Sequence, residues 1–215
     1  MDTVSWVLYF IAAPLLILIA IVATVLNVTV FMSRFFVKSR SSTLEMTYSL
    51  AVTDTLSSIA QAVSLLWNSF APHVLGIKIE NYCFSMSLEV FRMGFMLTGV
   101  FHIAALGFVH YLQIARPFDH TRLLSLKQTH VLICVMWIAP TLALTIFFWS
   151  FPGTGFQATN CVGDDNLAFY SALNFRVPVS LIIFILMAAT CAIYWRLLKV
   201  VDTVSTLIEG ISRTE

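Results

Sequence analysis

Residues 99–118 read GVFHIAALGFVHYLQIARPF, an apolar run that ends in a basic residue and a proline. The run has the composition of a membrane-spanning helix. It is expected to end at Arg116-Pro117, because proline lacks an amide donor and disfavours helix in the residue before it. The whole chain has the same character, since 59% of its 215 residues are hydrophobic and 11% are charged. Soluble domains are about half apolar and about a quarter charged, so this composition indicates a multi-pass membrane protein.

Five stretches are long enough to cross about 30 Å of hydrocarbon as helices. They lie near residues 6–32, 43–70, 83–115, 129–151 and 169–195. We therefore expect an all-α fold, a transmembrane helical bundle of five spans that forms one domain over residues 1–215. The first span has no basic segment before it and is too long for a cleavable signal peptide, so we expect it to be retained. The tail, 196–215, is too polar to span and is expected to continue helix five in the cytoplasm.

Positive charges mark alternate connections between the spans. They follow spans one, three and five, whereas the connection between spans two and three carries only Lys78. Because Lys and Arg gather on the cytoplasmic side, this alternation predicts an N-terminus outside and a C-terminus inside, with the plasma membrane as the expected location. The formal net charge is only +1, which argues against a basic surface for nucleic acid. We therefore expect membrane lipid, and not nucleic acid, as a partner.

The end of span three carries a spaced motif. Tyr111 follows Val109-His110, Ile114 stands three residues later and Pro117 six residues later. This spacing resembles the cytoplasmic end of the third helix in rhodopsin-like (class A) G-protein-coupled receptors, where the triplet is usually Asp-Arg-Tyr. The resemblance implies that His110, Tyr111, Arg116 and Pro117 face a heterotrimeric G protein.

Further motifs extend the resemblance over the other spans. Residues 49–54 read SLAVTD, close to the family's Asn-Leu-Ala-x-x-Asp, and Asn27, Trp137 and Pro178 stand in spans one, four and five where the family has its asparagine, tryptophan and proline. The loose fit is most similar to the divergent serpentine chemoreceptors of the large nematode type. The family has seven spans, and the motifs of its sixth and seventh helices have no counterpart here.

The resemblance implies a chemosensory receptor whose intact form binds a small extracellular ligand and couples to a G protein. We expect this chain to be such a receptor cut off after the fifth helix. We expect it not to activate a G protein alone, because it has neither helix six nor the third-helix arginine. The alternatives are a non-signalling receptor that modulates a full-length partner through homo- or hetero-oligomers, and a small transporter.

Ionisable residues inside spans are candidate functional residues, because burying them in lipid is costly. Glu89 and Arg92 are three residues apart, so they share a helix face. The candidate ligand-binding residues are Glu89, Arg92, Phe95 and Arg176, of which the two arginines would bind a carboxylate or other anion. The alternative is an internal ion pair between Glu89 and Arg92 or Arg176 without any ligand.

Asn27 and Asp54 form a second candidate polar group. The resemblance implies a sodium and water pocket at Asp54, while the alternative is a hydrogen-bonded Asp54 that holds helices together. His102 is expected to be a packed residue with a backbone or hydroxyl partner. No catalytic or metal-binding motif is present, so we expect no enzyme activity, cofactor or metal.

Four cysteines allow three pairings of two disulfides. Cys83 begins span three and Cys161 lies in the turn-rich segment 152–168, so the oxidising exterior would permit a disulfide between them, which we favour. Cys134 and Cys191 lie inside spans, where we expect buried packing thiols.

Overall fold

The computed structural model describes residues 3–38, 41–77, 82–115, 125–153, 155–157, 169–170 and 172–212. Within these ranges the regular structure is helical, without strands, and five helical segments are long and apolar enough to cross a membrane. The first segment is α1 (Thr3–Val7), the π-helical turn η1 (Leu8–Ala12), α2 (Ala13–Met32) and the 3-10 turn η2 (Ser33–Phe35). The second is α3 (Ser42–Leu65), the π-helical turn η3 (Leu66–Phe70) and α4 (Ala71–Val74). The others are α5 (Tyr82–Ala115), α7 (Leu126–Trp149) and α9 (Leu173–Ser212), with a short 3-10 turn η4 (Gly155–Gln157).

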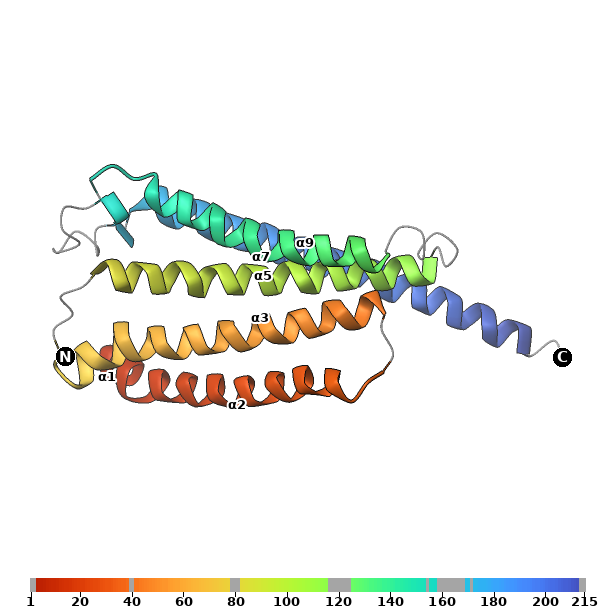
Figure 1. Ribbon diagram of the computed structural model, residues 1–215, viewed down its shortest axis with the longest axis horizontal. Coiled ribbons are helices and arrows are strands. Elements are labelled where there is room, and N and C mark those ends of the chain that lie inside the picture. The colour runs from red at the N-terminus through yellow and green to blue at the C-terminus, as the bar shows by residue number, and fades with distance from the viewer. Residues whose placement is uncertain are drawn as a thin grey trace.

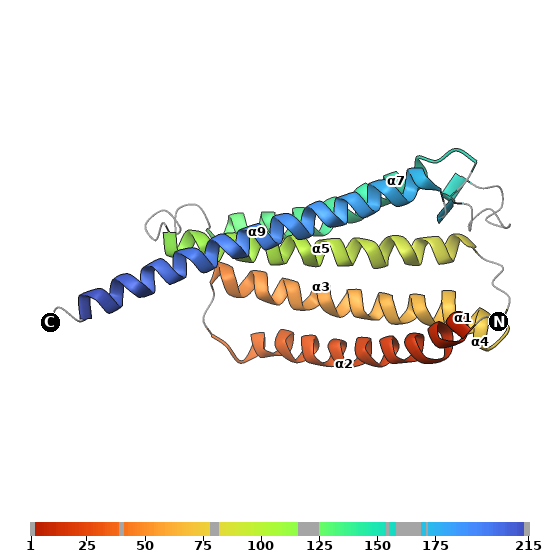
Figure 2. The ribbon, with the colours of Figure 1, turned by 180° about the vertical axis from the view of Figure 1, so that it is seen from behind.

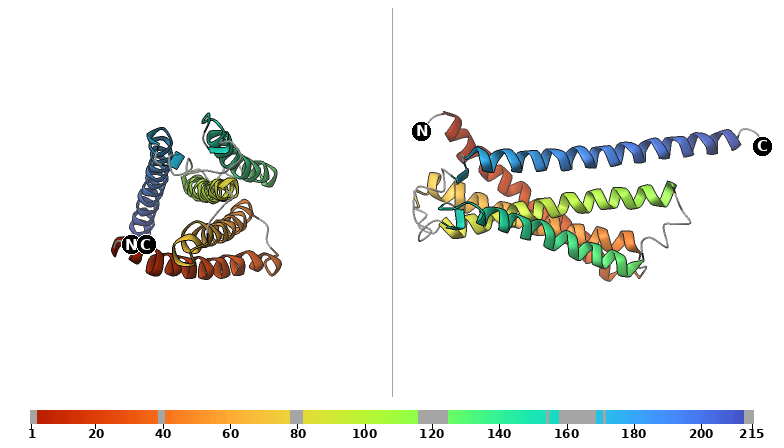
Figure 3. Two further views of the ribbon diagram at one scale, coloured as in Figure 1. Left: turned by 90° about the vertical axis from the view of Figure 1, so that its left-hand side faces the viewer. Right: turned by 90° about the horizontal axis from the view of Figure 1, so that it is seen from above.

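The five segments run side by side and alternate in direction (Figures 1 and 2). α2 and α3 lie on one side of α5, and α7 and α9 lie on the other (Figure 3). α5 packs against α3, α7 and α9, whereas α2 packs chiefly against α3. We call the two ends of the bundle the Tyr82 end and the Ala115 end, after the first and last residues of α5.

Three glycines let neighbouring helices approach α5 closely. A Cβ at Gly94 would lie 2.9 Å from Thr141 on α7, one at Gly99 would lie 3.2 Å from Asp54 on α3, and one at Gly107 would lie 3.1 Å from side chains of α9. Small residues at helix contacts allow the van der Waals packing that holds membrane helices together. α5 is therefore the central helix because it offers a small residue to each of three neighbours.

The predicted fold class and the five spans are confirmed, although their ends differ from the apolar runs. α7 begins at Leu126, three residues before the predicted start, because Ser125 and Gln128 form a capping box. The backbone N–H of Gln128 donates to Ser125 Oγ at 3.4 Å, and the backbone N–H of Ser125 donates to Gln128 Oε1 at 3.0 Å. α9 begins at Leu173, after the predicted start, and continues to Ser212, so much of the predicted tail is part of the same helix.

An aromatic cluster closes the Tyr82 end of the bundle. Phe148 of α7 is fully buried, and its ring centroid lies 5.3 Å from that of Phe169 and 5.2 Å from that of Phe175 on α9. Rings at these distances gain more than their area burial alone. Tyr170 packs on this cluster, with its ring centroid 6.5 Å from that of Phe148 and 5.5 Å from that of Phe175.

Candidate functional site

The charged pair on α5 forms the centre of a polar group in the half of the bundle nearer the Tyr82 end. Arg92 Nε donates to Glu89 Oε2 at 2.8 Å, and Arg92 Nη2 makes a second contact with the same oxygen. Only 13% of the Glu89 side chain and 23% of the Arg92 side chain are exposed. The structure therefore forms the internal ion pair that the sequence left open as an alternative.

Side chains of α3 complete this polar group. Ser64 Oγ donates to Glu89 Oε1, Asn68 Nδ2 donates to the same oxygen at 3.2 Å, and Arg92 Nη1 donates to Gln61 Oε1 at 3.1 Å. Both Glu89 oxygens are thus hydrogen-bonded, which stabilises a charge at membrane depth. Spacing along α5 predicted the pair, but the α3 partners depend on how the two helices face each other.

Tyr170 lies beside this pair with its hydroxyl unused. The oxygen is buried, and neither it nor Ser85 Oγ has a hydrogen-bond partner among the described residues. Burial raises the pKa of Tyr170, the Glu89 charge raises it further and the Arg92 charge lowers it. Tyr170, which precedes α9, is therefore a neutral hydrogen-bond donor at physiological pH, under the electrostatic influence of Glu89 and Arg92.

The other two predicted ligand-binding residues, Phe95 and Arg176, form no hydrogen bond or salt bridge with the ion pair in the ranges that the structure describes. Phe95 stacks on Phe91 with centroids 6.1 Å apart and meets the Trp137 ring edge-on at the same separation. Arg176 is exposed in the first turns of α9 and makes no ion pair within the described part of the chain. Ligand binding by these residues stays a prediction.

Three spans meet at one hydroxyl near the middle of the bundle. Trp137 Nε1 of α7 donates to Ser49 Oγ of α3 at 2.9 Å, and Ser49 Oγ lies 2.8 Å from Nε2 of His102 on α5. His102 Nδ1 lies 2.8 Å from the Thr98 carbonyl oxygen, which can only accept, so Nδ1 carries the proton and Nε2 accepts from Ser49. His102 is fully buried. The prediction of a backbone or hydroxyl partner is confirmed, because His102 contacts both the Thr98 carbonyl and the Ser49 hydroxyl.

Asn27 and Asp54 are not hydrogen-bonded to each other. Asn27 Nδ2 donates at 3.0 Å to the Ala23 carbonyl of its own helix, because an amide four residues on reaches that oxygen. Asp54 instead faces α5, with Oδ1 3.2 Å from where a Gly99 Cβ would stand. Within the described residues, no three His, Cys, Asp or Glu side chains are grouped to hold a metal ion.

The Ala115 end ties α5 to α3. His110 Nδ1 lies 3.3 Å from Gln113 Oε1, and Gln113 Nε2 donates to Thr43 Oγ1 of α3 at 3.0 Å. Tyr111 is half-buried, while Arg116 and Pro117 lie outside the described residues. His110 is thus joined to α3 through the side chain of Gln113.

Sequence reasoning missed an ion pair at this end. Arg34 Nη2, at the end of the first span, donates to Glu45 Oε2 of α3 at 2.9 Å, and His130 Nε2 of α7 lies 4.0 Å from the same oxygen. The Arg34 guanidinium also stands 5.9 Å from the centroid of the Tyr48 ring. The sequence does carry a signal for this ion pair, because Glu45 stands in the first turn of a helix that directly follows a basic connection.

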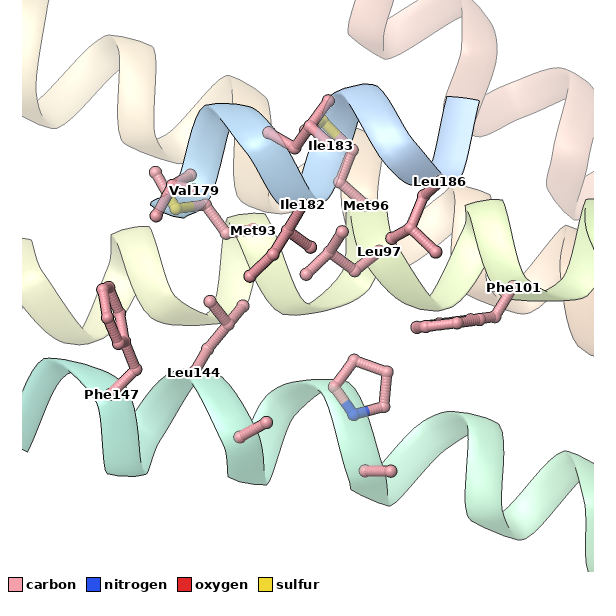
Figure 4. Close-up of a pocket in the computed structure, with 13 residues that line it drawn as sticks. Met93, Met96, Leu97, Phe101, Leu144, Phe147, Val179, Ile182, Ile183 and Leu186 are labelled. Atoms are coloured by element: carbon pink, nitrogen blue, oxygen red, sulfur yellow. The ribbon is translucent and has the colours of Figure 1, made fainter. Parts of the chain in front are cut away.

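A cavity of about 430 Å³ lies between α5, α7 and α9 (Figure 4). Its walls are apolar side chains: Met93, Met96, Leu97, Phe101, Ala139, Pro140, Ala143, Leu144, Phe147, Val179, Ile182, Ile183 and Leu186. It includes none of the candidate ligand-binding residues from the sequence. Cavities of this size are typical of small-molecule sites.

The cysteines separate into two kinds. Cys134 and Cys191 are free thiols and are exposed, so the expectation that they pack as buried residues is wrong: each lies on an exposed part of its helix, α7 or α9. Cys161 lies outside the described residues, so its pairing with Cys83 stays a prediction.

The chain matches no protein-family model, and no curated protein is significantly similar to it in sequence.

Proposed function

We propose that this chain is a receptor-like membrane protein that binds a small ligand at the Tyr82 end. The observation that carries the proposal is the buried Tyr170 hydroxyl, which has no partner among the described residues and lies within the electrostatic influence of Glu89 and Arg92. Buried polar groups in proteins are nearly always paired, so an unpaired hydroxyl beside a charged pair indicates a place for a polar molecule.

The chemistry of the site favours a ligand that accepts hydrogen bonds. Tyr170 is a neutral donor, and a guanidinium has five N–H groups, of which the contacts of Arg92 with Glu89 and Gln61 use three. A carboxylate or carbonyl oxygen between Tyr170 and Arg92 would meet donors from both. Because Glu89 already neutralises Arg92, a neutral carbonyl compound suits the site as well as an anion does.

The receptor assignment rests on the motif residues and their contacts. Ser49 and Trp137 come from two separate motifs that resemble those of the rhodopsin-like G-protein-coupled receptors, and Trp137 Nε1 donates directly to Ser49 Oγ, which also contacts His102. Contact between motif residues of different spans supports one common helix arrangement. The proposal includes the chemosensory class, the Tyr82 end outside the plasma membrane, and a Cys83–Cys161 disulfide that holds the outer segment over the bundle.

Signalling by this chain alone is not part of the proposal. His110 stands where the resemblance expects an arginine, and its Nδ1 is hydrogen-bonded to Gln113 Oε1. We expect ligand binding without nucleotide exchange on an added heterotrimeric G protein.

The test uses the full chain in lipid nanodiscs and a library of small carboxylates, ketones and amines, with thermal unfolding as the readout. Tyr170→Phe is expected to weaken binding of a stabilising carboxylate or ketone about fivefold, because one hydrogen bond contributes about 1 kcal/mol. Tyr9→Phe is the matched control, since Tyr9 lies at the same end and stacks on His73.

The proposal is wrong if no acceptor-bearing compound stabilises the chain, or if such compounds bind Tyr170→Phe as tightly as the unchanged protein. Ligand-dependent nucleotide exchange by a purified G protein would overturn the non-signalling part alone.

A second candidate function, modulation of a partner receptor, is favoured by α9. From Arg176 to Thr203 no side chain of this helix is fully buried, so the apolar faces that do not pack on α5 are open to another helix. Co-purification of two differently tagged copies, or of a longer relative, would support this function, and a monomer in detergent would contradict it. A transporter is less favoured, because Glu89, Arg92 and Asp54 are not among the residues that line the cavity between α5, α7 and α9.

A further inference from the structure

The cavity between α5, α7 and α9 lies near the middle of the membrane-spanning length. On α5 its walls run from Met93 to Phe101, around the centre of a helix that extends from Tyr82 to Ala115. At 1.5 Å per residue, the walls on each helix are about 12 Å long, well under half of the hydrocarbon thickness of about 30 Å. Phe147 stands toward one end of the cavity and Phe101 toward the other (Figure 4).

The walls determine what kind of molecule the cavity can hold. Every lining side chain is apolar, and none of them can donate or accept a strong hydrogen bond. A ligand with a charge or an unpaired hydroxyl would lose its hydration without compensation, at a cost of several kcal/mol. The cavity therefore suits an uncharged molecule that is apolar throughout.

The arrangement of the helices provides an entrance from the bilayer. α7 and α9 each pack along α5, but they are not an extensively packed pair, and they diverge from each other toward the Ala115 end (Figure 3). Met96 is 41% exposed and Ile182 is 50% exposed, so cavity walls reach the surface that lipid would cover. Pro140 of α7 is itself a wall residue, within a helix that it prevents from completing one backbone hydrogen bond.

We propose that this cavity is a binding site for a compact, uncharged apolar molecule that enters from the bilayer between α7 and α9. The occupant is a free molecule rather than the tail of a bilayer lipid, because the walls are short and a phenylalanine stands toward each end. The site is separate from the polar site at Tyr170, and a ligand in it contacts α5, α7 and α9 at once. Occupation would hold α7 and α9 at a set separation across α5.

The experiment is photolabelling of the full chain in nanodiscs with a diazirine-bearing n-decane, followed by mass spectrometry of the labelled peptides. We expect labels within residues 93–101, 139–147 and 179–186, reduced by excess n-decane. Ala143→Phe places a ring in the cavity and is expected to lower this labelling about tenfold, the equivalent of about 1.4 kcal/mol. Ala192→Phe is the matched control, because Ala192 is an exposed alanine of α9 that is not part of the cavity wall.

Gel filtration and circular dichroism report whether Ala143→Phe still folds, and Ala139→Phe fills the same cavity if it does not. A second arm uses phosphatidylcholine with a diazirine at the end of its acyl chain. Equal labelling of the same peptides by this lipid would assign the cavity to bilayer chains and overturn the proposal. Labelling of Ala143→Phe and Ala139→Phe at the level of the unchanged protein would also overturn it. Neither result bears on carbonyl or carboxylate binding at Tyr170, so the two proposals can fail separately.

Discussion

Replacing Ser49 by alanine removes the hydroxyl at which three helices meet. The substitution deletes the acceptor of Trp137 Nε1 and the donor to His102 Nε2, which are two interhelical hydrogen bonds of 2.9 and 2.8 Å. Interhelical hydrogen bonds in membranes contribute about 0.6 kcal/mol on average and up to about 1.7 kcal/mol. His102 is fully buried and would keep an unpaired nitrogen, so the two losses should sum to about 1–3 kcal/mol.

The assay is reversible unfolding of the full chain in mixed micelles, with increasing sodium dodecyl sulfate. A double-mutant cycle with Trp137→Phe isolates the contact between the two side chains, and a coupling free energy of about 0.6–1.7 kcal/mol is expected. Ser87→Ala is the control, because Ser87 Oγ donates only to the Cys83 carbonyl of its own helix, at 2.8 Å. A Ser49→Ala protein as stable as Ser87→Ala, or a coupling energy of zero, would refute the reasoning.

Other substitutions address the remaining contacts. Gly107→Leu should destabilise the same unfolding transition by about 1–3 kcal/mol, because a Cβ there would already lie 3.1 Å from side chains of α9. Glu89→Gln leaves the Arg92 cation without its anion and should cost about 2 kcal/mol after allowance for the partial exposure of Arg92, with part of the loss recovered in a Glu89→Gln, Arg92→Gln double variant. If Cys83 and Cys161 are joined, alkylation without reductant should modify only the two free cysteines, and Cys83→Ser should expose Cys161 to the reagent; four modified cysteines in the unreduced protein would contradict this.

The five spans could be predicted because length and hydropathy alone decide whether a helix can cross a bilayer. The ends of the helices could not be predicted in this way, since a helix extends beyond its apolar run until a cap or another break ends its hydrogen bonding. The capping box at Ser125 starts α7 before the apolar run begins, and α9 continues well beyond Trp195 into a polar sequence. Apolar content determines the buried length of a span, whereas caps determine the length of the helix.

The candidate site divides in the same way. Residues on one helix face, such as Glu89 and Arg92, can be paired from their spacing because the helix itself brings them together. The contacts of Ser49 with His102 and Trp137 join three helices, so they depend on the rotation of each helix about its axis, which composition does not specify. The cavity is harder still to predict, because it is formed where apolar side chains of α5, α7 and α9 fail to meet.

The length of α9 has a mechanical consequence. Lys199 Nζ lies 5.3 Å from the centroid of the Trp195 ring, a pairing that suits the membrane interface, where tryptophan and lysine gather. From Trp195 to Ser212 the helix continues without a break, which at 1.5 Å per residue is a rod about 26 Å long beyond that level. A tilt of α9 by about 5° would move the far end of this rod by about 2 Å. Small changes in the separation of α7 and α9 would therefore be magnified into displacements in the aqueous phase, as a lever converts a small rotation into travel at its tip.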